Sequence, residues 1–470
     1  MTIPLKTDTL IVGGGPAGLA PLVAAARCGT LPDLLEAGLI VVERGAGIGA
    51  GRIGRYVIRS DSSAETLLSC VQNSPEPRLA AIAADGAATA VATYGKGSVP
   101  LPFVGDLMES VGDGLQAMIE RTPGSRIMTR HDACDTRQQA DGTWLTRIRA
   151  CETGIVTDIR SRVVLLATGA HQPEARLAVE PVAGQPLLPR YTGKLVQSDV
   201  ALTKAGLADI ERRLAAIDHP RIAVIGGSTS AVATANLLLH GLHRNLPHGA
   251  ITLMHRHALP IFYSSAAAAR EDGYNEFGID DICPVSGFVF RCAGFRFESR
   301  ELVMRLRGLG GRPPEHRITL HRLRNDEPDG DAVDAESRRL LDEADIIIAC
   351  LGYRPNGLPV LDIAGRPVRL LADQPGGALV GGRCGVLDER GCEIPGLYGI
   401  GLAAGFRPSG AMGGEPSFRG QSNGLWLWQN DVGSLILDRI AEHRAPPPDR
   451  CLDDLHLVPT TAYVGETCAA

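Results

Sequence analysis

The chain has 470 residues, of which 44% are hydrophobic and 21% are charged, and its formal net charge is −6. This length is enough for two or three domains, and the composition is that of a globular protein with a core. The net negative charge argues against nucleic acid or an anionic membrane as the main partner. No apolar run approaches the ~20 residues of a membrane span.

The eleven cysteines form no C-x-x-C pair, and no His or Cys cluster has the spacing of a zinc site. Free thiols of this kind are typical of a reducing cytoplasm. The apolar N-terminus lacks a basic leader, so we do not interpret it as a signal peptide. We therefore expect a cytoplasmic protein with no metal site.

The first predicted element is a short apolar strand that ends at Val12 and runs into a glycine turn and a helix. Gly13, Gly15 and Gly18 have the G-x-G-x-x-G spacing of a dinucleotide-binding turn. Phosphates would lie at the positive N-terminus of the helix that follows. Glu43 ends the next apolar strand, where a carboxylate would accept the hydroxyls of an adenosine ribose.

A second glycine-rich loop, residues 45–55, follows directly. It is either a flexible surface loop or a loop that wraps the cofactor, with Arg52 or Arg55 near a phosphate or the flavin edge. We favour the second interpretation. The residues predicted to bind the first nucleotide here are Gly13, Gly15, Pro16, Ala17, Gly18, Glu43, Arg44, Gly49 and Arg52.

From residue 127 to residue 159 the pattern changes to short alternating strands, which predicts a β-meander with an Asp-Gly hairpin turn. The apolar run 163–166 then suits a parallel strand that is buried on both faces. It is followed by Ala-Thr-Gly, and small residues at Thr168 and Gly169 leave room for a cofactor to pass. A meander inserted at this point is an elaboration of flavin-binding folds.

Residues 221–235 repeat the opening pattern of apolar strand, glycine turn and small-residue helix. The next strand ends in His255-Arg256-His257, where a guanidinium would bind a 2′-phosphate that a carboxylate would repel. The sequence therefore predicts NADPH as the second nucleotide, the alternative being a solvated basic strand end. The predicted contacts are Gly226, Gly227, Ser228, Thr229, Ser230 and Arg256.

A further buried strand ends near Gly352, and a long helix is predicted from about Gln421 to His443. Its N-terminus would present N–H groups to the flavin, so we predict cofactor contacts at Gly401 and Gln421. The predicted fold is α/β with two Rossmann-like domains, the NADPH domain being inserted in the FAD domain. The predicted limits are 1–195 and 351–445 for the FAD domain, 196–350 for the NADPH domain, and 446–470 for a tail.

Five short motifs occur in an order that resembles the flavoproteins with two dinucleotide-binding domains, and within them the FAD- and NADPH-dependent monooxygenases. The motifs are Gly13–Gly18, Ala167–Gly169, Gly226–Ala231, Gly352–Pro355 and Leu397–Gly401. The resemblance implies FAD on the first glycine turn and NADPH on the second. It covers most of the chain, from residue 9 to about 440.

The sequence departs from the motifs of two groups within these flavoproteins, the disulfide reductases and the Baeyer–Villiger monooxygenases. The redox-active cysteine pair of disulfide reductases is not visible, and Gly401-Leu402 stands where many of them have Gly-Asp. Tyr191-x-Gly193-x-x-x-Gln197 is similar to the F-x-G-x-x-x-H signature of Baeyer–Villiger monooxygenases, with both end residues replaced. These replacements disfavour oxygenation of a carbonyl.

The segment Asn275-Glu-Phe277 is similar to a region of the ornithine and lysine N-hydroxylating monooxygenases. That resemblance implies that Asn275 contacts the substrate or the nicotinamide ribose. It also implies that a C4a-hydroperoxide of the flavin carries the difficult chemistry, while the protein excludes water and positions the substrate. We therefore predict polar orienting groups at Arg52, Gln197 and Asn275 as the catalytic residues.

The predicted function is oxygenation of a small metabolite by O₂, most simply N-hydroxylation of an amine or amino acid. A homo-oligomer is compatible with the sequence. Two alternatives stay open: an NAD(P)H-dependent FAD oxidoreductase that inserts no oxygen, and a non-catalytic flavin-binding protein.

Overall fold

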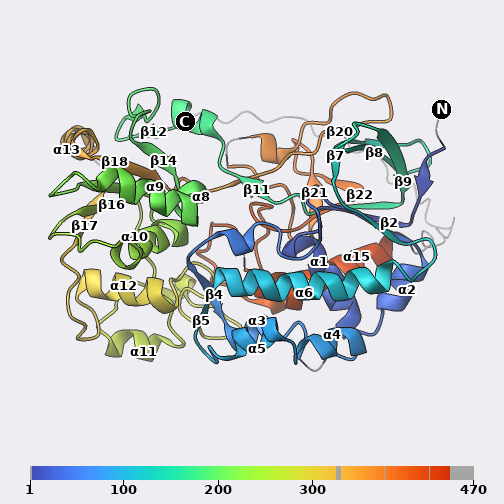
Figure 1. Cartoon of the computed structure of the whole chain (residues 1–470), viewed down its shortest axis with the longest axis horizontal. Coiled ribbons are helices and arrows are strands. Elements are labelled where there is room, and N and C mark those ends of the chain that lie inside the picture. Colours follow the sequence, from blue (N-terminus) through green and yellow to red (C-terminus); the bar gives the residue numbers. More distant parts are fainter. Residues whose placement is uncertain (1–2, 73, 324–329, 375, 423, 445–470) are drawn as a thin grey trace, which may run out of the picture.

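The computed structural model describes residues 3–72, 74–323, 330–374, 376–422 and 424–444. The molecule is elongated, with the green and yellow middle of the chain at one end and its blue, teal and red parts at the other (Figure 1). None of the described helices combines the length and hydropathy that crossing a membrane requires. The predicted tail, 446–470, lies outside the described residues.

A six-stranded sheet lies at the centre of the blue, teal and red end. Strands β10 (Val163–Leu166), β2 (Thr9–Val12) and β3 (Leu39–Val42) are parallel and buried along their whole length, as the apolar runs predict. β2 lies between β10 and β3. The edge pair β21–β22 is antiparallel. In order across the sheet the strands are β21 (Gly385–Leu387), β22 (Glu393–Gly399), β10 (Val163–Leu166), β2 (Thr9–Val12), β3 (Leu39–Val42) and β6 (Arg126–Met128).

Helices from both ends of the sequence pack together beside this sheet. Helix α1 (Pro16–Arg27) contacts α15 (Gly433–Arg444), and a Cβ atom on Gly433 would come within 2.6 Å of the carbonyl oxygen of Ala20. The C-terminal part of the chain thereby returns to the first nucleotide unit. Other helices at this end are α2 (Leu31–Glu36), α3 (Ala64–Leu68), α4 (Pro77–Ile82), α5 (Gly86–Ala92) and α6 (Leu101–Ile119).

The predicted β-meander is confirmed as the antiparallel strands β7 (His131–Gln138), β8 (Trp144–Ala150) and β9 (Val156–Ser161). The turn between β7 and β8 uses Gly142 at φ +80°, a conformation that favours glycine. Two short strands complete this five-stranded sheet, β1 (Leu5–Lys6) beside β9 and β20 (Val360–Leu361) beside β7.

The green and yellow end contains a second parallel sheet of five strands. Helix α10 (Thr229–Gly241) contacts β15 and β16 of this sheet and also packs on α12 (Phe297–Arg307). The other long helices here are α9 (Lys204–Leu214) and α13 (Gly330–Glu343). In order the strands are β14 (Leu195–Gln197), β18 (Ile346–Ala349), β15 (Ile222–Ile225), β16 (Ile251–His255) and β17 (Ile318–Arg322).

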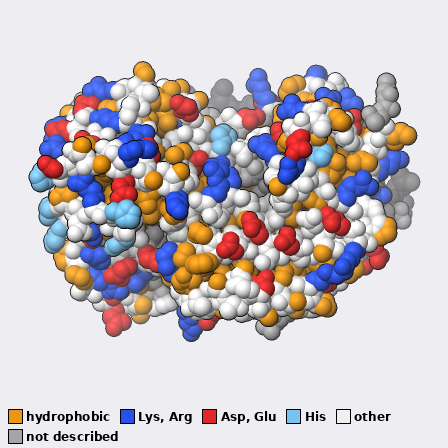
Figure 2. Space-filling view, in the orientation of Figure 1, with side chains coloured by type: hydrophobic (Ala, Val, Ile, Leu, Met, Phe, Trp, Pro, Cys, Tyr) orange, Lys and Arg blue, Asp and Glu red, His pale blue; other side chains and the backbone are white. Residues whose placement is uncertain are grey.

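The buried hydrophobic side chains form one cluster from residues 10–167 and 358–440, and two smaller ones from residues 177–350. The domain limits themselves stay a prediction. On the face shown in Figure 2, acidic and basic side chains are interspersed and do not form one large patch of a single sign.

The predicted C-terminal helix begins later than expected and is not uniform. Gly424 precedes the first helical residue, so Gln421 lies outside the helix. The segment consists of α14 (Leu425–Leu427), a π-helical turn (Trp428–Val432) and α15. A π-turn inside an α-helix is frequent at functional sites, and Trp426 and Trp428 line the large cavity described next.

Candidate cofactor and substrate cavity

One large cavity extends between the two glycine turns. Its volume is about 2060 Å³, against roughly 300–1,000 Å³ for the pocket of one small ligand. Gly13 and Gly15 of the first turn and Ser228 and Ser230 of the second all line it. A space of this size and position accommodates more than one ligand.

The first turn leaves no room for side chains where a phosphate would approach. Gly13 has φ +106°, and a Cβ atom there would overlap the carbonyl oxygen of Ala167. A Cβ atom on Gly18 would overlap the carbonyl oxygen of Gly13, so α1 lies close to β2. Gly15 is the N-cap of α1 and supplies no side-chain cap, which leaves the first N–H groups of the helix open to the cavity. This cradle fits the pyrophosphate of the predicted FAD.

The carboxylate of Glu43 is fixed at the end of β3 and lines the cavity. It accepts hydrogen bonds from the N–H groups of Gly14 (2.7 Å) and Gly45 (2.6 Å). A carboxylate has about four lone-pair sites, so capacity for ribose hydroxyls is left. Its neighbour Arg44 also borders the cavity, and its guanidinium pairs with Asp132 at 2.7 Å.

The second turn opens into the same cavity. Gly226 follows β15 with φ +144°, and a Cβ atom there would lie 2.7 Å from the carbonyl oxygen of Cys350. Ser228 is the N-cap of α10 and makes no side-chain cap hydrogen bond. The N-terminus of α10 is therefore a second place for a phosphate, as the sequence predicts for NADPH. Gly227, Thr229 and Ser230 line the cavity here.

The other predicted cofactor residues either line the cavity or lie close to residues that line it. Thr168 borders it and donates its hydroxyl to the carbonyl oxygen of Asn356 at 2.8 Å. Gly49 donates its N–H to the Gly14 carbonyl oxygen at 2.8 Å, which ties the second glycine loop to the first turn. Gly401, at φ +111°, lies against Ala17. Gly169, Pro16, Ala17 and Gln421 are also lining residues, whereas Gly18, Gly49, Gly226 and Gly401 are not.

Arg256 lies just beyond the end of β16 and outside the cavity lining. Its guanidinium donates to the carbonyl oxygen of Pro181 at 3.0 Å, and its neighbour His257 does line the cavity. The predicted contact of Arg256 with a 2′-phosphate stays a prediction.

Of the three predicted catalytic residues, the structure places only Arg52 in the cavity lining. Its guanidinium lies 3.5 Å from the carboxylate of Asp199. Gln197 ends β14 and donates to the carbonyl oxygen of Gln172 at 3.2 Å. Asn275 is exposed, although its neighbour Tyr274 is buried and lines the cavity. The roles predicted for these three residues stay predictions.

Sequence reasoning missed a wall of the cavity built from residues 285–297. Phe288, Phe290, Arg291, Arg296 and Phe297 all line it. The sequence did contain a sign of this wall, because residues 288–297 hold four of the nine phenylalanines in the chain. They follow the NADPH strand without any glycine turn or motif, so pattern reading assigned them no role.

A missed carboxylate, Asp61, borders the cavity beside this wall. Asp61 is exposed toward the cavity, while the protein atoms around its carboxyl partly desolvate it. Burial raises the pKa of Asp61 above its usual range, and the charge of Arg296 and a hydrogen bond with Thr229 oppose that rise. Asp61 therefore sits between the second glycine turn and the arginine wall.

No protein-family model matches the chain. The chain is 32% identical over 438 residues to a CMP-5′-(3-aminopropyl)phosphonate hydroxylase from Streptomyces rubellomurinus, a match that covers 91% of this chain and 96% of that protein.

Among solved structures, the chain is similar to the FAD-bound cadaverine monooxygenase DfoA of Erwinia amylovora, with a TM-score of 0.54 and 11% identity over 97% of this chain and 100% of that one. It is also similar to the ornithine N-hydroxylase KtzI of Kutzneria sp. 744, solved with reduced FAD, NADP⁺ and L-ornithine. That match has a TM-score of 0.50 and 15% identity over 94% of this chain and 100% of the other. At these identities the solved structures show a shared fold.

Proposed function

Because this chain belongs to the FAD- and NADPH-dependent flavoprotein monooxygenases, we propose that it N-hydroxylates a primary amine on a small metabolite. The observation that carries the proposal is the single cavity onto which two helix N-termini open. A hydride donor and a flavin bound there would share one enclosed space with the substrate. The relative named as a hydroxylase of an aminopropyl compound supports an amine as the acceptor.

Bound FAD would accept a hydride from NADPH and activate O₂, so that one oxygen atom passes to the amine and the other leaves as water. The residues of the chain bind, orient and exclude water. Glu43 and the first turn would hold the adenosine half of FAD, and the second turn would hold the phosphates of NADPH. Trp426 of α14 and Trp428 of the π-turn, together with Tyr274, give the cavity an apolar wall that limits the access of water.

We further propose that the enzyme acts in the cytoplasm on a small-molecule substrate and O₂, with no nucleic-acid partner. The net charge of −6 and the sparse cysteines support these proposals. A homo-oligomer stays compatible with them.

The test uses FAD-loaded protein with NADPH, ¹⁸O₂ and three probes: ornithine, cadaverine and CMP-5′-(3-aminopropyl)phosphonate. We expect at least one hydroxylamine that carries a single ¹⁸O atom for each NADPH consumed, measured by mass spectrometry. NADPH oxidation that reduces an added dye, with no ¹⁸O in any product, would favour the oxidoreductase alternative. Stoichiometric FAD with negligible NADPH turnover would favour a non-catalytic flavoprotein.

A further inference from the structure

Residues 288–297, the part of the 285–297 wall that is here called the Arg–Phe segment, present cations and aromatic rings to the cavity. Arg291 and Arg296 line it together with Phe288, Phe290 and Phe297. This combination of side chains suits a ligand with a phosphate-type anion and an aromatic ring. These side chains belong to neither glycine turn, so the two predicted nucleotide sites do not account for them.

The two arginines have no carboxylate partner. Arg291 donates to the carbonyl oxygen of Met412 and lies 3.7 Å from the sulfur of Cys283. Arg296 donates to the carbonyl oxygen of Arg291 at 2.7 Å, and its guanidinium lies 3.8 Å above the ring of Phe262. Among the described residues, no carboxylate oxygen lies within 4.0 Å of either guanidinium.

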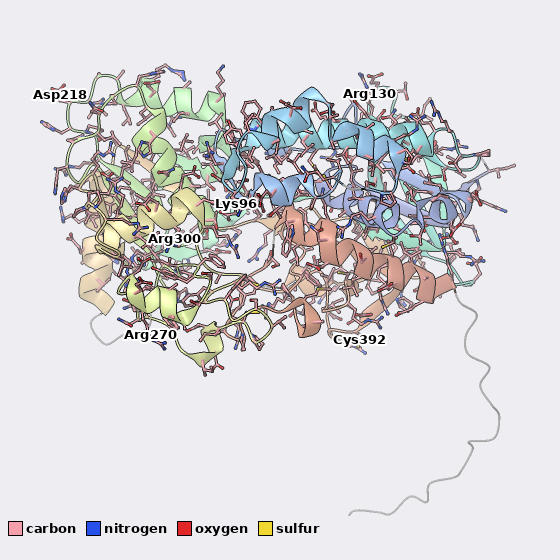
Figure 3. All side chains as sticks on the ribbon, turned by 90° about the horizontal axis from the view of Figure 1, so that it is seen from below. Lys96, Arg130, Asp218, Arg270, Arg300 and Cys392 are labelled. Carbon is pink, nitrogen blue, oxygen red and sulfur yellow. The ribbon has the colours of Figure 1, made fainter. Side chains whose placement is uncertain are left out.

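Neighbouring arginines behave differently. Arg300, Arg305 and Arg307 on α12 each form an ion pair with an Asp or Glu. Arg59 on β4 (Arg59–Ser63) pairs at 2.6 Å with Glu298 of α12. Arg300, which is labelled in Figure 3, belongs to the same helix. Arg291 and Arg296 thus differ from the ion-paired arginines of α12 and from Arg59, which also lines the cavity.

Two carboxylates, Asp61 and Glu415, act on the charge of Arg296, but neither lies within 4.0 Å of its guanidinium. Glu415 accepts hydrogen bonds from the N–H groups of Cys292 (2.9 Å) and Ala293 (2.8 Å), so it is engaged with the backbone of the Arg–Phe segment. Asp61 interacts with Arg296 only through its charge, and burial raises the pKa of its carboxyl. Burial also lowers the pKa of Arg296. A half-buried guanidinium without a counterion is costly unless a ligand supplies the anion.

The backbone of the segment is held in an unfavourable conformation. Phe290 and Phe297 have φ values of +47° and +46°, which are outliers for bulky residues. Such strained conformations cluster at ligand clamps and active sites. Gly294 has no space for a side chain, because a Cβ atom there would come within 2.5 Å of the backbone nitrogen of Phe262. Together with the contacts of Arg291 with Met412 and of Arg296 with Phe262, this backbone holds both guanidinium groups beside the cavity without a ligand.

We propose that the Arg–Phe segment is the subsite for a nucleoside that the amine substrate carries through a phosphate or phosphonate linkage. Arg291 and Arg296 bind the phosphorus-bound oxygens, and the phenylalanine rings pack against the base. This inference rests on the proposed N-hydroxylation, and it assigns to named residues the recognition of a nucleotide-tagged amine. Each guanidinium has five N–H donors, so the backbone contacts described above leave donors for the ligand.

The test measures binding to the FAD-loaded protein in the presence of NADP⁺, with cytidine 5′-monophosphate as the probe in isothermal titration calorimetry. We expect Arg296→Ala and Arg291→Ala each to weaken its binding by about tenfold or more, the loss expected for one charge-assisted contact. NADP⁺ affinity should change by less than about twofold. Arg213→Ala, on the exposed face of α9 and paired with Asp209, is the matched control and should change neither.

The flavin absorbance and far-UV circular dichroism of each variant show that it is folded. If an alanine variant fails to fold, Arg296→Lys keeps the charge but loses the planar fork, and the same weakening is expected in smaller measure. Equal losses for cytidine 5′-monophosphate and NADP⁺ would assign the segment to the nicotinamide nucleotide and overturn the proposal. A wild-type enzyme that N-hydroxylates ornithine or cadaverine and does not bind the probe would overturn this inference while leaving the proposed function intact.

Discussion

At the scale of single residues, the predicted cofactor site depends on two glycines, whose lack of a side chain allows close backbone contacts. Gly13 and Gly18 lie so close to backbone atoms of Ala167 and of Gly13 that a methyl group at either position would overlap them. The pyrophosphate cradle and the close contact of α1 with β2 depend on these contacts. Glycine is thus required by geometry here and not by flexibility.

We expect Gly18→Ala to lower the affinity for FAD by about tenfold or more, because separating α1 from β2 displaces the N–H groups that face the phosphates. The measurement is the ratio of flavin to protein absorbance after equilibration with a fixed concentration of free FAD. Gly86→Ala is the control, since a Cβ atom there meets nothing within 4 Å. Normal FAD content in Gly18→Ala would show that the cradle does not depend on this contact.

At the scale of elements, a buried carboxylate joins α12 to the segment that leads into β17. Glu315 is 6% exposed, and its carboxylate pairs with Arg317 at 2.7 Å and with Arg305 of α12 at 2.9 Å. The hydrogen bond from Arg317 lowers the pKa of Glu315 from 4.5 to about 2, although burial acts in the opposite direction. The Arg–Phe segment leads directly into α12, so this junction also anchors one wall of the cavity.

A lowered carboxyl pKa stabilises the folded protein above the unfolded-state pKa of 4.5, and that stability is lost as the pH falls toward 2. We expect Glu315→Gln to lower the free energy of unfolding at pH 7 by on the order of 3 kcal/mol. The difference between wild type and variant should shrink by about 1 kcal/mol at pH 4.

Denaturant titration at the two pH values measures these free energies. Glu301→Gln is the matched control, because Glu301 pairs with Arg312 at an exposed site, and such pairs contribute about 0–1 kcal/mol. A difference that stays constant between pH 7 and pH 4 would contradict the assignment of the stability to the Glu315 charge.

At the scale of the whole molecule, two parallel sheets with separate hydrophobic clusters share one cavity. In the first sheet β2 leads into α1, and in the second sheet β15 leads into α10. The N-terminus of each of these helices opens onto that cavity. Two cofactors bound at these helix N-termini would meet between the sheets, and each phosphate group would be held at the end of one sheet alone. This arrangement predicts separable effects of the two ligands on local stability.

We expect FAD to slow backbone hydrogen exchange in β2 and α1, and NADP⁺ added to FAD-loaded protein to slow it in β15 and α10, since a ligand stabilises the elements that bind it. Hydrogen-exchange mass spectrometry resolves these segments. NADP⁺ protection confined to α1, with α10 unchanged, would contradict the assignment of the second glycine turn.

Local sequence determined much of the fold and the positions of both nucleotide turns. Strand, glycine turn and helix are short-range features, so residues 9–28 and 221–241 were readable from spacing and hydrophobicity alone. The meander was readable for the same reason. The start of the C-terminal helix was placed too early, because its apolar pattern extends past Gly424 while the backbone becomes helical only after it.

Only the tertiary structure decided which side chains share the cavity. Asn275 lies in a motif but is exposed, whereas Arg291 and Arg296 lie in no motif and face the cavity. Side-chain direction in a loop depends on packing with segments far along the chain, such as the contact of Arg291 with Met412. Sequence thus determined where the two nucleotides would bind, because that depends on local backbone geometry. What the rest of the cavity recognises depends on contacts that only folding creates.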